Sequence, residues 1–283
     1  MALAGPLIYI LAEANGELDA AMHPKNRLNY AKAKRKIVAF IRRKTKEAGA
    51  TGVVLGLSGG LDSAVTAYLS REALGADQVF AVVMPHRDVT PPHDVKRART
   101  LAKDLGIRCK VIDIKPAVEL DANLLGRWDR LSRGNLMART RMKYLYFYAN
   151  TMNRVVAGTG DRSEITIGYY TKYGDGGVDF LPLGGLYKTQ VREMAKRLGI
   201  SKEIIDAPSS PAFWPSHDAE EEIGFSYELL DHGLDLIQKD LPGPAICRQT
   251  GLSMRELRRI KEMMKTNAHK RNPPEICEIQ VDP

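Results

Sequence analysis

The chain has 283 residues, of which 44% are hydrophobic and 27% are charged. These proportions are typical of a globular protein and exclude a disordered or collagen-like chain, and the length permits one large domain or two small ones. The net charge of +8 favours an anionic partner, either a nucleotide or a nucleic acid, with a basic solvated surface as the alternative. Cys109, Cys247 and Cys277 are far apart, so neither a disulfide framework nor a zinc site is indicated.

The first 25 residues are interpreted as an N-terminal extension. Their apolar run is interrupted by Gly5 and Pro6 and ends at Glu13, so it is too short to span a bilayer. A signal peptide would carry Lys or Arg before this run, and none is present. We therefore expect a cytoplasmic protein with no membrane anchor, in which residues 1–25 are an extra packing segment at a subunit interface.

Residues 26–49 have a helical pattern, with apolar side chains on one face and basic side chains on the other. Strands and helices then alternate. Strands are predicted over 53–57, 79–84, 109–114 and 154–157, with a short fifth strand near Phe180, and helices over 62–74, 92–105, 135–152 and 186–198. This alternation predicts an α/β fold with a doubly wound, parallel, five-stranded sheet and helices on both faces. The tail from Pro208 indicates a C-terminal helical extension, and residues 26–283 are predicted to form a single domain.

The turn after the first strand, GLSGGLDS over residues 56–63, carries the first functional signal. A strand, a glycine turn and a helix start present backbone N–H groups at a positive helix end, which suits a phosphate. Ser58 and Ser63 add hydroxyl donors. Asp62 by itself would repel a phosphate, but its presence is explained if it holds Mg²⁺ that bridges the phosphates. The alternative is a tight turn with an N-capping serine and no ligand.

This turn resembles the SGGxDS signature of the N-type ATP pyrophosphatases, which cleave ATP between the α- and β-phosphates and adenylate their substrate. The signature is specific for the superfamily but not for the substrate, since relatives make GMP, asparagine, argininosuccinate and modified tRNA. The resemblance implies that ATP is bound by Gly56, Leu57, Ser58, Gly59, Gly60, Leu61, Asp62 and Ser63.

A second set of motifs, AGTGDRSEITIGYYTKYGDGGVDFLPLGGLYKTQV, runs from residue 157 to 191. It contains a glycine turn with Thr159, a carboxylate at Glu164, a polar loop over 171–177, and Lys188 at the start of the next helix. Taken singly, each feature is typical of a surface loop or a solvated helix. As an ordered set they closely resemble ammonia-dependent NAD⁺ synthetase, whose pattern GTGxxSE…GYxTKYGDGG…P…LxKTxV is nearly all present.

Three further segments are similar to the same family. GNLMARTRM at 134–142 is similar to its GNxxARxRM helix, AHKR at 268–271 to its HKR segment, and the stretch from Pro208 to its PSADLWxxQxDExELGxxYE segment. The resemblance covers about residues 26–274. Residues 209–214 are one residue longer than the family pattern and lack its acid, which leaves open whether Ser209 or Ser210 contacts ATP.

The resemblance implies an ATP- and Mg²⁺-dependent ligase that amidates deamido-NAD⁺ to NAD⁺. The nicotinate carboxylate attacks the α-phosphate, pyrophosphate leaves, and ammonia then displaces AMP from the acyl adenylate. Asp62 and Glu164 would hold the Mg²⁺ cofactor. Lys188 would neutralise charge on the phosphates, and Asp175 would accept a proton from the attacking nitrogen, although a carboxylate is a weak base for this step.

The remaining contacts of both substrates also follow from the resemblance. ATP, the co-substrate, would contact Thr159, Lys188 and Ser209 in addition to the glycine turn. The implied contacts of deamido-NAD⁺ are Arg139, Lys172, Asp179, His269 and Lys270.

Two other classes of protein compete with this interpretation. A tRNA-modifying enzyme of the same superfamily would use the basic residues at 32–46 and 255–271, but Met254, Leu257 and Ile260 indicate that the second segment is a packed amphipathic helix. Such enzymes are also not expected to share TKYGDGG or GNxxARxRM, so we expect no nucleic acid partner. A non-catalytic nucleotide-binding stress protein would have no use for Asp62 and Glu164 as a metal pair.

Glutamine-dependent relatives carry a long N-terminal amidohydrolase domain, and only about 50 residues precede the first strand. We therefore expect free ammonia as the nitrogen donor, with a separate glutaminase as the alternative. The family resemblance also implies a homodimer with deamido-NAD⁺ at the interface. The helix at 135–152 is apolar around much of its circumference, which favours a partner subunit unless the C-terminal helices cover it.

Overall fold

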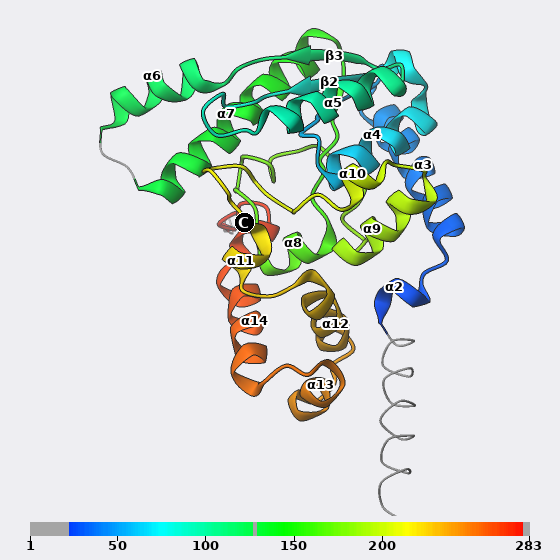
Figure 1. Cartoon of the computed structure of the whole chain (residues 1–283), viewed down its shortest axis with the longest axis vertical. Coiled ribbons are helices and arrows are strands. Elements are labelled where there is room, and N and C mark those ends of the chain that lie inside the picture. The colour runs from blue at the N-terminus through cyan, green and yellow to red at the C-terminus, as the bar shows by residue number, and fades with distance from the viewer. Residues whose placement is uncertain (1–22, 127–128, 280–283) are drawn as a thin grey trace, which may run out of the picture.

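The computed structural model describes residues 23–126 and 129–279 (Figure 1). The predicted N-terminal extension, residues 1–25, lies outside the described residues except for 23–25, so its proposed packing role stays a prediction. No helix in these two described ranges is long and apolar enough to cross a membrane.

Within the described residues, the core of the fold is a parallel sheet of four strands in the order β3-β2-β1-β4. Its strands are β1 (Val53–Gly56), β2 (Val79–Val83), β3 (Arg108–Val111) and β4 (Val155–Val156). β1 and β2 are built from buried, mostly branched apolar residues, as expected for central strands covered on both faces. The alternating pattern therefore predicted the α/β class and the parallel sheet correctly.

The fifth strand predicted near Phe180 is wrong, because this residue forms only an isolated parallel bridge with Ala157. Two features limit the pairing. The side chain of Asp179 accepts a hydrogen bond from Val156 N at 2.6 Å, in place of a backbone carbonyl. Pro182 then follows and has no N–H to donate to a ladder. The segment therefore ends the sheet as a turn.

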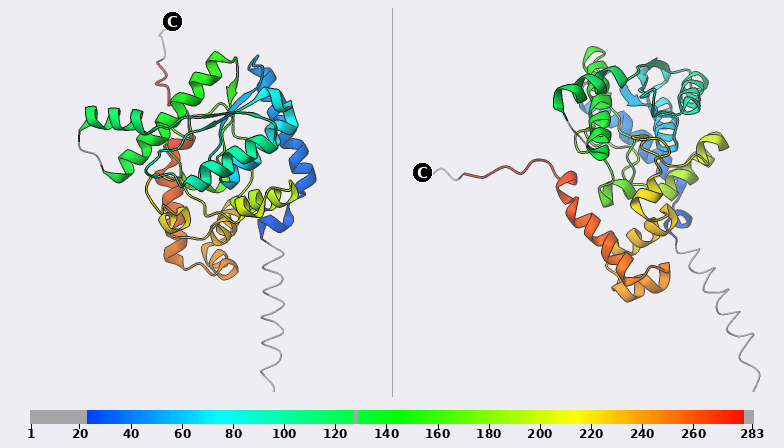
Figure 2. Two further views of the ribbon diagram at one scale, coloured as in Figure 1. Left: turned by 45° about the horizontal axis from the view of Figure 1, so that its top comes forward. Right: turned by 60° about the vertical axis from the view of Figure 1, so that its left-hand side comes forward.

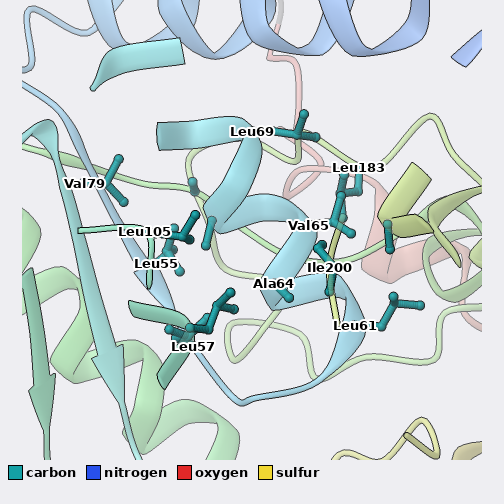
Figure 3. Close-up of a cluster of buried hydrophobic side chains, with 14 of the residues drawn as sticks. Leu55, Leu57, Leu61, Ala64, Val65, Leu69, Val79, Leu105, Leu183 and Ile200 are labelled. Atoms are coloured by element: carbon teal, nitrogen blue, oxygen red, sulfur yellow. The ribbon is translucent and has the colours of Figure 1, made fainter. Parts of the chain in front are cut away.

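Helices cover both faces of the sheet, because successive strand residues point to opposite sides. On one face, Val53, Leu55 and Leu57 pack in a core with α3 (Tyr30–Glu47), α4 (Leu61–Leu74), α5 (Pro92–Asp104) and α9 (Lys188–Arg197) (Figure 3). On the other face, Val54 and Val82 pack with α6 (Lys115–Leu125) and α7 (Arg130–Thr151). The doubly wound arrangement is confirmed.

The C-terminal part is a helical lobe at one end of the molecule, opposite the end where β3 lies (Figures 1 and 2). After α8 (Arg162–Ile167) and α10 (Lys202–Ile205) it comprises α11 (Ala219–Ile223), α12 (Tyr227–Gln238), α13 (Gly243–Thr250), α14 (Met254–Thr266) and α15 (Ala268–Arg271). Its core contains Ile223, Tyr227 and Leu230 together with Ile167 of α8. The lobe is thus continuous with the helix that follows β4.

The described N-terminal residues pack on this lobe and on α9. His23 Nε2 lies 3.0 Å from the carbonyl of Glu228, and Lys25 Nζ lies 2.8 Å from the Glu228 carboxylate. The short helix α2 (Pro24–Arg27) is also held by Gln190, whose Nε2 donates to the Pro24 carbonyl at 3.0 Å. Residues far apart in the sequence therefore meet at this end of the molecule.

Candidate active site

The turn between β1 and α4 is anchored at both ends by Leu57 and Leu61, which point into the core (Figure 3). Within it, Gly59 has a φ of +86°, and a Cβ at this position would lie 2.3 Å from the Asp94 carbonyl. Only glycine fits such a backbone. Gly60 precedes α4 and has no side chain to cap the helix, so the first amides of α4 are left for an anion.

The hydroxyls of Ser58 and Ser63 in this turn are hydrogen-bonded to each other. Ser58 Oγ and Ser63 Oγ are 3.1 Å apart, and Ser63 Oγ also donates to the Gly60 carbonyl at 3.0 Å. These bonds fix the hydroxyls beside the amides of the turn. The alternative that the motif is only a turn with an N-capping serine is wrong, because the N-cap of α4 is Gly60.

The strand order puts this turn at a switch point of the sheet. The chain leaves β1 for β2 and β3 on one side and then crosses back to β4 on the other side of β1. In open α/β sheets, ligands bind in the crevice outside the carboxyl ends of the two strands where the order reverses. The glycine turn and the loop with Thr159, which is half-buried, follow those two strands.

Lys188, the first residue of α9, is fully buried next to this crevice. Its Nζ lies 2.7 Å from Asp62 Oδ2, 2.8 Å from Glu164 Oε1 and 2.9 Å from Asp161 Oδ2. The Tyr227 ring completes the enclosure, with its centroid 5.1 Å from the ammonium. The structure thus unites three predicted residues, from α4, α8 and α9, and adds Asp161.

The charges in this cluster strongly perturb one another. Burial alone would lower the pKa of Lys188, but Asp161, Asp62 and Glu164 raise that pKa well above its usual value. The pKa values of Glu164 and Asp161 are both raised, first by burial and also by repulsion from neighbouring carboxylates. Three carboxylates thus share one ammonium, and further positive charge would stabilise their ionised forms.

The donor set fits Mg²⁺. Asp62 Oδ1 is buried and has no hydrogen-bond partner among the described residues, and carboxylate oxygens are the ligands that this ion prefers. Within residues 23–126 and 129–279, no group of three or more His, Cys, Asp or Glu residues is arranged to hold a metal by itself. A bound ion would therefore need oxygens from phosphates or water beside Asp62 and Glu164, as is usual for Mg²⁺.

Most residues predicted to contact the dinucleotide form a second group around the loop at 168–177. Arg139 Nε of α7 donates to the Lys172 carbonyl at 3.4 Å, and Lys172 Nζ donates to the His269 carbonyl at 2.8 Å. Lys270 Nζ donates to the Gly168 carbonyl at 2.6 Å. The structure therefore brings Arg139, Lys172, His269 and Lys270 together, although they come from three distant segments of the chain.

Two acids border this second group. Asp175 Oδ1 accepts from Thr171 N at 2.9 Å, and its side chain is exposed to solvent. Asp179 Oδ1 accepts from Tyr146 OH at 3.0 Å. An open pocket of about 350 Å³ lies here, lined by Arg139, Met142, Lys143, Tyr146, Tyr173 and Gly177. The acids and the pocket thus adjoin the cations.

The segment with Ser209 and Ser210 lies between α10 and α11. Ser210 Oγ accepts from Ala212 N at 3.0 Å, which uses this hydroxyl within its own turn, while the Ser209 carbonyl accepts from Ala219 N at 2.9 Å. The choice of Ser209 as an ATP contact stays a prediction, as do the contact roles of Thr159 and of the dinucleotide residues.

Sequence reasoning missed Asp161 and Asp231. Asp161 had a local signal, because an acid three residues before Glu164 matches a capping box, and the structure has that box at the start of α8. Asp231 had none, since it bonds to Ser163, which lies 68 residues away. Both carboxylates are fully buried.

The glycine turn, the switch point and the buried acid–lysine cluster define a nucleotide-binding enzyme of the doubly wound α/β class. Comparison with known proteins makes the class specific. A family model for NAD synthase matches residues 33–274. The chain belongs to the NAD synthase family and is a ligase. This membership decides against a non-catalytic nucleotide-binding protein.

Named relatives agree with this membership. An NH₃-dependent NAD⁺ synthetase from Hyperthermus butylicus is 49% identical over 249 residues, which cover 87% of this chain and 90% of that protein. An NMN synthetase from Francisella tularensis superposes with a TM-score of 0.80 at 33% identity, covering 89% of this chain and 100% of that one. An NH₃-dependent NAD synthetase from Campylobacter jejuni superposes at 0.76 with the same identity and coverage.

Proposed function

We propose that this enzyme joins ammonia to the nicotinate carboxylate of deamido-NAD⁺ to make NAD⁺, at the expense of ATP. A carboxylate oxygen would bond to the α-phosphorus as the bond to pyrophosphate breaks. The nitrogen of ammonia would then attack the acyl carbon, AMP would leave, and the nitrogen would lose a proton. The observation that carries the proposal is the Lys188 cluster beside the glycine turn, in a chain of this family.

The residues of the first group suit the ATP half of the reaction. The amides of the glycine turn can cradle phosphate oxygens. Ser58 and Ser63 would donate to the same oxygens by giving up their bonds to Ser63 and to the Gly60 carbonyl. Lys188 can neutralise charge that develops on the leaving pyrophosphate. Asp62 and Glu164 would hold Mg²⁺, which supplies Lewis-acid stabilisation of the phosphates when bound.

The residues of the second group suit the dinucleotide half. Arg139, Lys172, His269 and Lys270 supply donors for its phosphates and ribose hydroxyls, and Asp179 can accept from a hydroxyl. Asp175 would be the proton acceptor because it lies in the same loop as Lys172, although an exposed carboxylate is a weak base for this step. We infer that the donor is free ammonia and that the enzyme works in the cytoplasm as a homodimer, with residues 26–283 as one domain.

The experiment is an assay of the purified protein with ATP, MgCl₂, deamido-NAD⁺ and ammonium chloride. We expect NAD⁺ and AMP in equal amounts, and no product when any one component is omitted. Glutamine in place of ammonium tests the nitrogen source, and it should support little turnover. Formation of ADP in place of AMP would overturn the adenylation step.

A second candidate substrate is a mononucleotide, favoured by the likeness to the NMN synthetase of Francisella tularensis. Such a substrate would present the same nicotinate carboxylate without the adenylate half. Comparing kcat/KM for nicotinate mononucleotide and deamido-NAD⁺ distinguishes the two. We expect the dinucleotide to be preferred, and the reverse preference would replace deamido-NAD⁺ in the proposal above.

A further inference from the structure

A buried carboxylate in the helical lobe joins the starts of the two helices that carry the acid–lysine cluster. Asp231 of α12 is fully buried. Its Oδ1 accepts from Ser163 Oγ at 2.5 Å, and its Oδ2 accepts from Thr189 N at 2.8 Å. Ser163 lies in the first turn of α8, and Thr189 lies in the first turn of α9. One side chain thus bridges three helices.

Ser163 closes the network on Lys188 itself. The Ser163 hydroxyl gives its proton to Asp231, so its lone pairs face the backbone N–H of Lys188, which donates to it at 2.9 Å. Ser163 is also the residue before Glu164. Asp231 and Ser163 therefore hold the backbone of Lys188 close to the backbone of Glu164.

The consequence is geometric. Lys188 Nζ donates to Asp62 Oδ2 at 2.7 Å and to Glu164 Oε1 at 2.8 Å, the range of charge-assisted hydrogen bonds, which are sensitive to small shifts. Asp161 Oδ2 lies 2.9 Å away as an ion pair. If α8 and α9 moved apart, Glu164 and Lys188 would separate, whereas Asp62 on α4 would stay in place. Neither Ser163 nor Asp231 contacts the ammonium directly, so any effect they have on it must act through this spacing.

We propose that Asp231 and Ser163 are positioning residues that set the distance between the α8 and α9 starts and so hold Lys188 in its catalytic place. The kinetic part of this proposal rests on the proposed function. The geometric part does not, because it concerns only the burial and mobility of the Lys188 side chain.

The first test measures Lys188 directly, without turnover. Wild type, Ser163→Ala and the control Ser226→Ala are treated with an imidoester without substrates, and modification of Lys188 is followed by mass spectrometry. Ser226 caps the same helix that carries Asp231, so its loss weakens the start of α12 without removing any hydrogen bond of the network. We expect Ser163→Ala to raise the modification rate about tenfold relative to the control. Equal rates in the two variants would overturn the proposal.

The second test uses kinetics in the same variants. We expect Ser163→Ala to lower kcat by about 10- to 100-fold, because a displacement of about 1 Å in a catalytic group has an effect of this size. KM for ATP should rise, whereas KM for deamido-NAD⁺ should stay within about twofold, and Ser226→Ala should leave all three values unchanged. A Ser163→Ala enzyme with normal kcat and normal KM for ATP would contradict the positioning role.

Asp231→Asn provides a variant of nearly constant volume in case Ser163→Ala does not fold. The amide oxygen of the new side chain still accepts from Thr189 N. Its amide nitrogen faces Ser163 Oγ, which already accepts a hydrogen bond from Lys188 N. The double variant should be no slower than the slower single variant, because both disturb one network. Additive losses in kcat would overturn the pairing. If wild type lacks ligase activity, only the proposed function fails, since the labelling test still decides the geometry.

Discussion

The Lys188 ammonium lies between Asp62 and Glu164, the two side chains predicted to hold Mg²⁺. At this position it acts as the counter-ion of the pair in the absence of substrates. Lys188→Met removes this charge and leaves the carboxylates unbalanced. We expect the variant to bind Mn²⁺, a Mg²⁺ substitute, at least about tenfold more tightly than wild type without ATP, since a unit charge some 4 Å away contributes a few kcal/mol near a protein surface.

The measurement is Mn²⁺ binding by electron paramagnetic resonance, together with the rise in Tm on adding Mn²⁺. The matched control is Lys188→Met combined with Asp62→Asn, which should lose the gain. If wild type and Lys188→Met bind Mn²⁺ equally, Asp62 and Glu164 are not the metal ligands.

Arg139 is exposed on α7, lines the 350 Å³ pocket and contacts the loop that holds Lys172. Arg139→Ala should therefore raise KM for deamido-NAD⁺ by about 10- to 100-fold and leave KM for ATP within about twofold, as expected for one charge-assisted contact worth about 1.5–3 kcal/mol. Steady-state kinetics with each substrate varied in turn provide the test. Arg43→Ala, on the exposed face of α3, serves as the control. Equal rises in both KM values would remove Arg139 from the dinucleotide site.

How far single residues can be predicted depends on whether their signal is local. Asp62, Glu164 and Lys188 each lie in a short motif, and the structure brings them within one hydrogen-bonding cluster. Asp231 occupies an ordinary amphipathic helix, and its role depends on how α12 packs against α8 and α9. Nothing in the sequence around a buried acid reveals which distant donors it meets.

At the scale of elements, the turn between β1 and α4 depends on one backbone conformation. Gly59→Ala would place a methyl group 2.3 Å from the Asp94 carbonyl at a φ of +86°. We expect a loss of about 2–4 kcal/mol in the free energy of unfolding and a higher KM for ATP, because both strain and overlap oppose the native turn. Urea unfolding monitored by circular dichroism gives the first quantity.

Gly75→Ala is the matched control for this substitution. Gly75 has nearly the same φ, +87°, but a Cβ there would meet nothing within 4 Å. Its variant should therefore lose only the strain term, about 1–3 kcal/mol, and keep the wild-type KM for ATP. If Gly59→Ala is no more destabilising than Gly75→Ala, the close approach to Asp94 is not a constraint.

Elements with a continuous apolar run were predictable, and elements fixed by side-chain bonds were not. Buried strands are predicted at residues 53–57 and 79–84 because nearly every side chain there is apolar. The segment at Phe180 has an apolar residue too, but the Asp179 side chain takes the Val156 amide that a strand would have used. The hydrophobic pattern of the sequence does not show that a side chain will take a hydrogen bond from the neighbouring strand.

At the scale of the whole molecule, α7 remains partly uncovered. Its residues Phe147 and Leu131 are 59% and 56% exposed, and Leu124 of the neighbouring α6 is 78% exposed. Single exposed apolar side chains do not by themselves mark an interaction surface, so the homodimer rests on the family resemblance and Phe147 supplies the position that tests it. We expect a homodimer by sedimentation velocity, and we expect Phe147→Asp to shift it to monomer. Ile276→Asp is the matched control, because Ile276 is also an exposed apolar residue but lies outside α7, and its variant should stay dimeric.

Dilution should weaken the apparent affinity for deamido-NAD⁺ if the interface completes the dinucleotide site, and Phe147→Asp should have the same effect. Tyr68→Phe on α4, which is remote from α7, is the control, and its affinity for deamido-NAD⁺ should equal that of wild type. A wild-type protein that sediments as a fully active monomer at assay concentrations contradicts both the interface and the shared site.

The contacts of the first described residues with α9 and α12 also have a consequence for folding during synthesis. Lys25 and Glu228 are separated by 203 residues along the chain, and Pro24 and Gln190 by 166. At about 5–20 residues per second, a ribosome needs roughly 10–40 s to make the partner of Lys25 after Lys25 itself. Residues 23–27 therefore leave the ribosome well before their partners and reach their native contacts late.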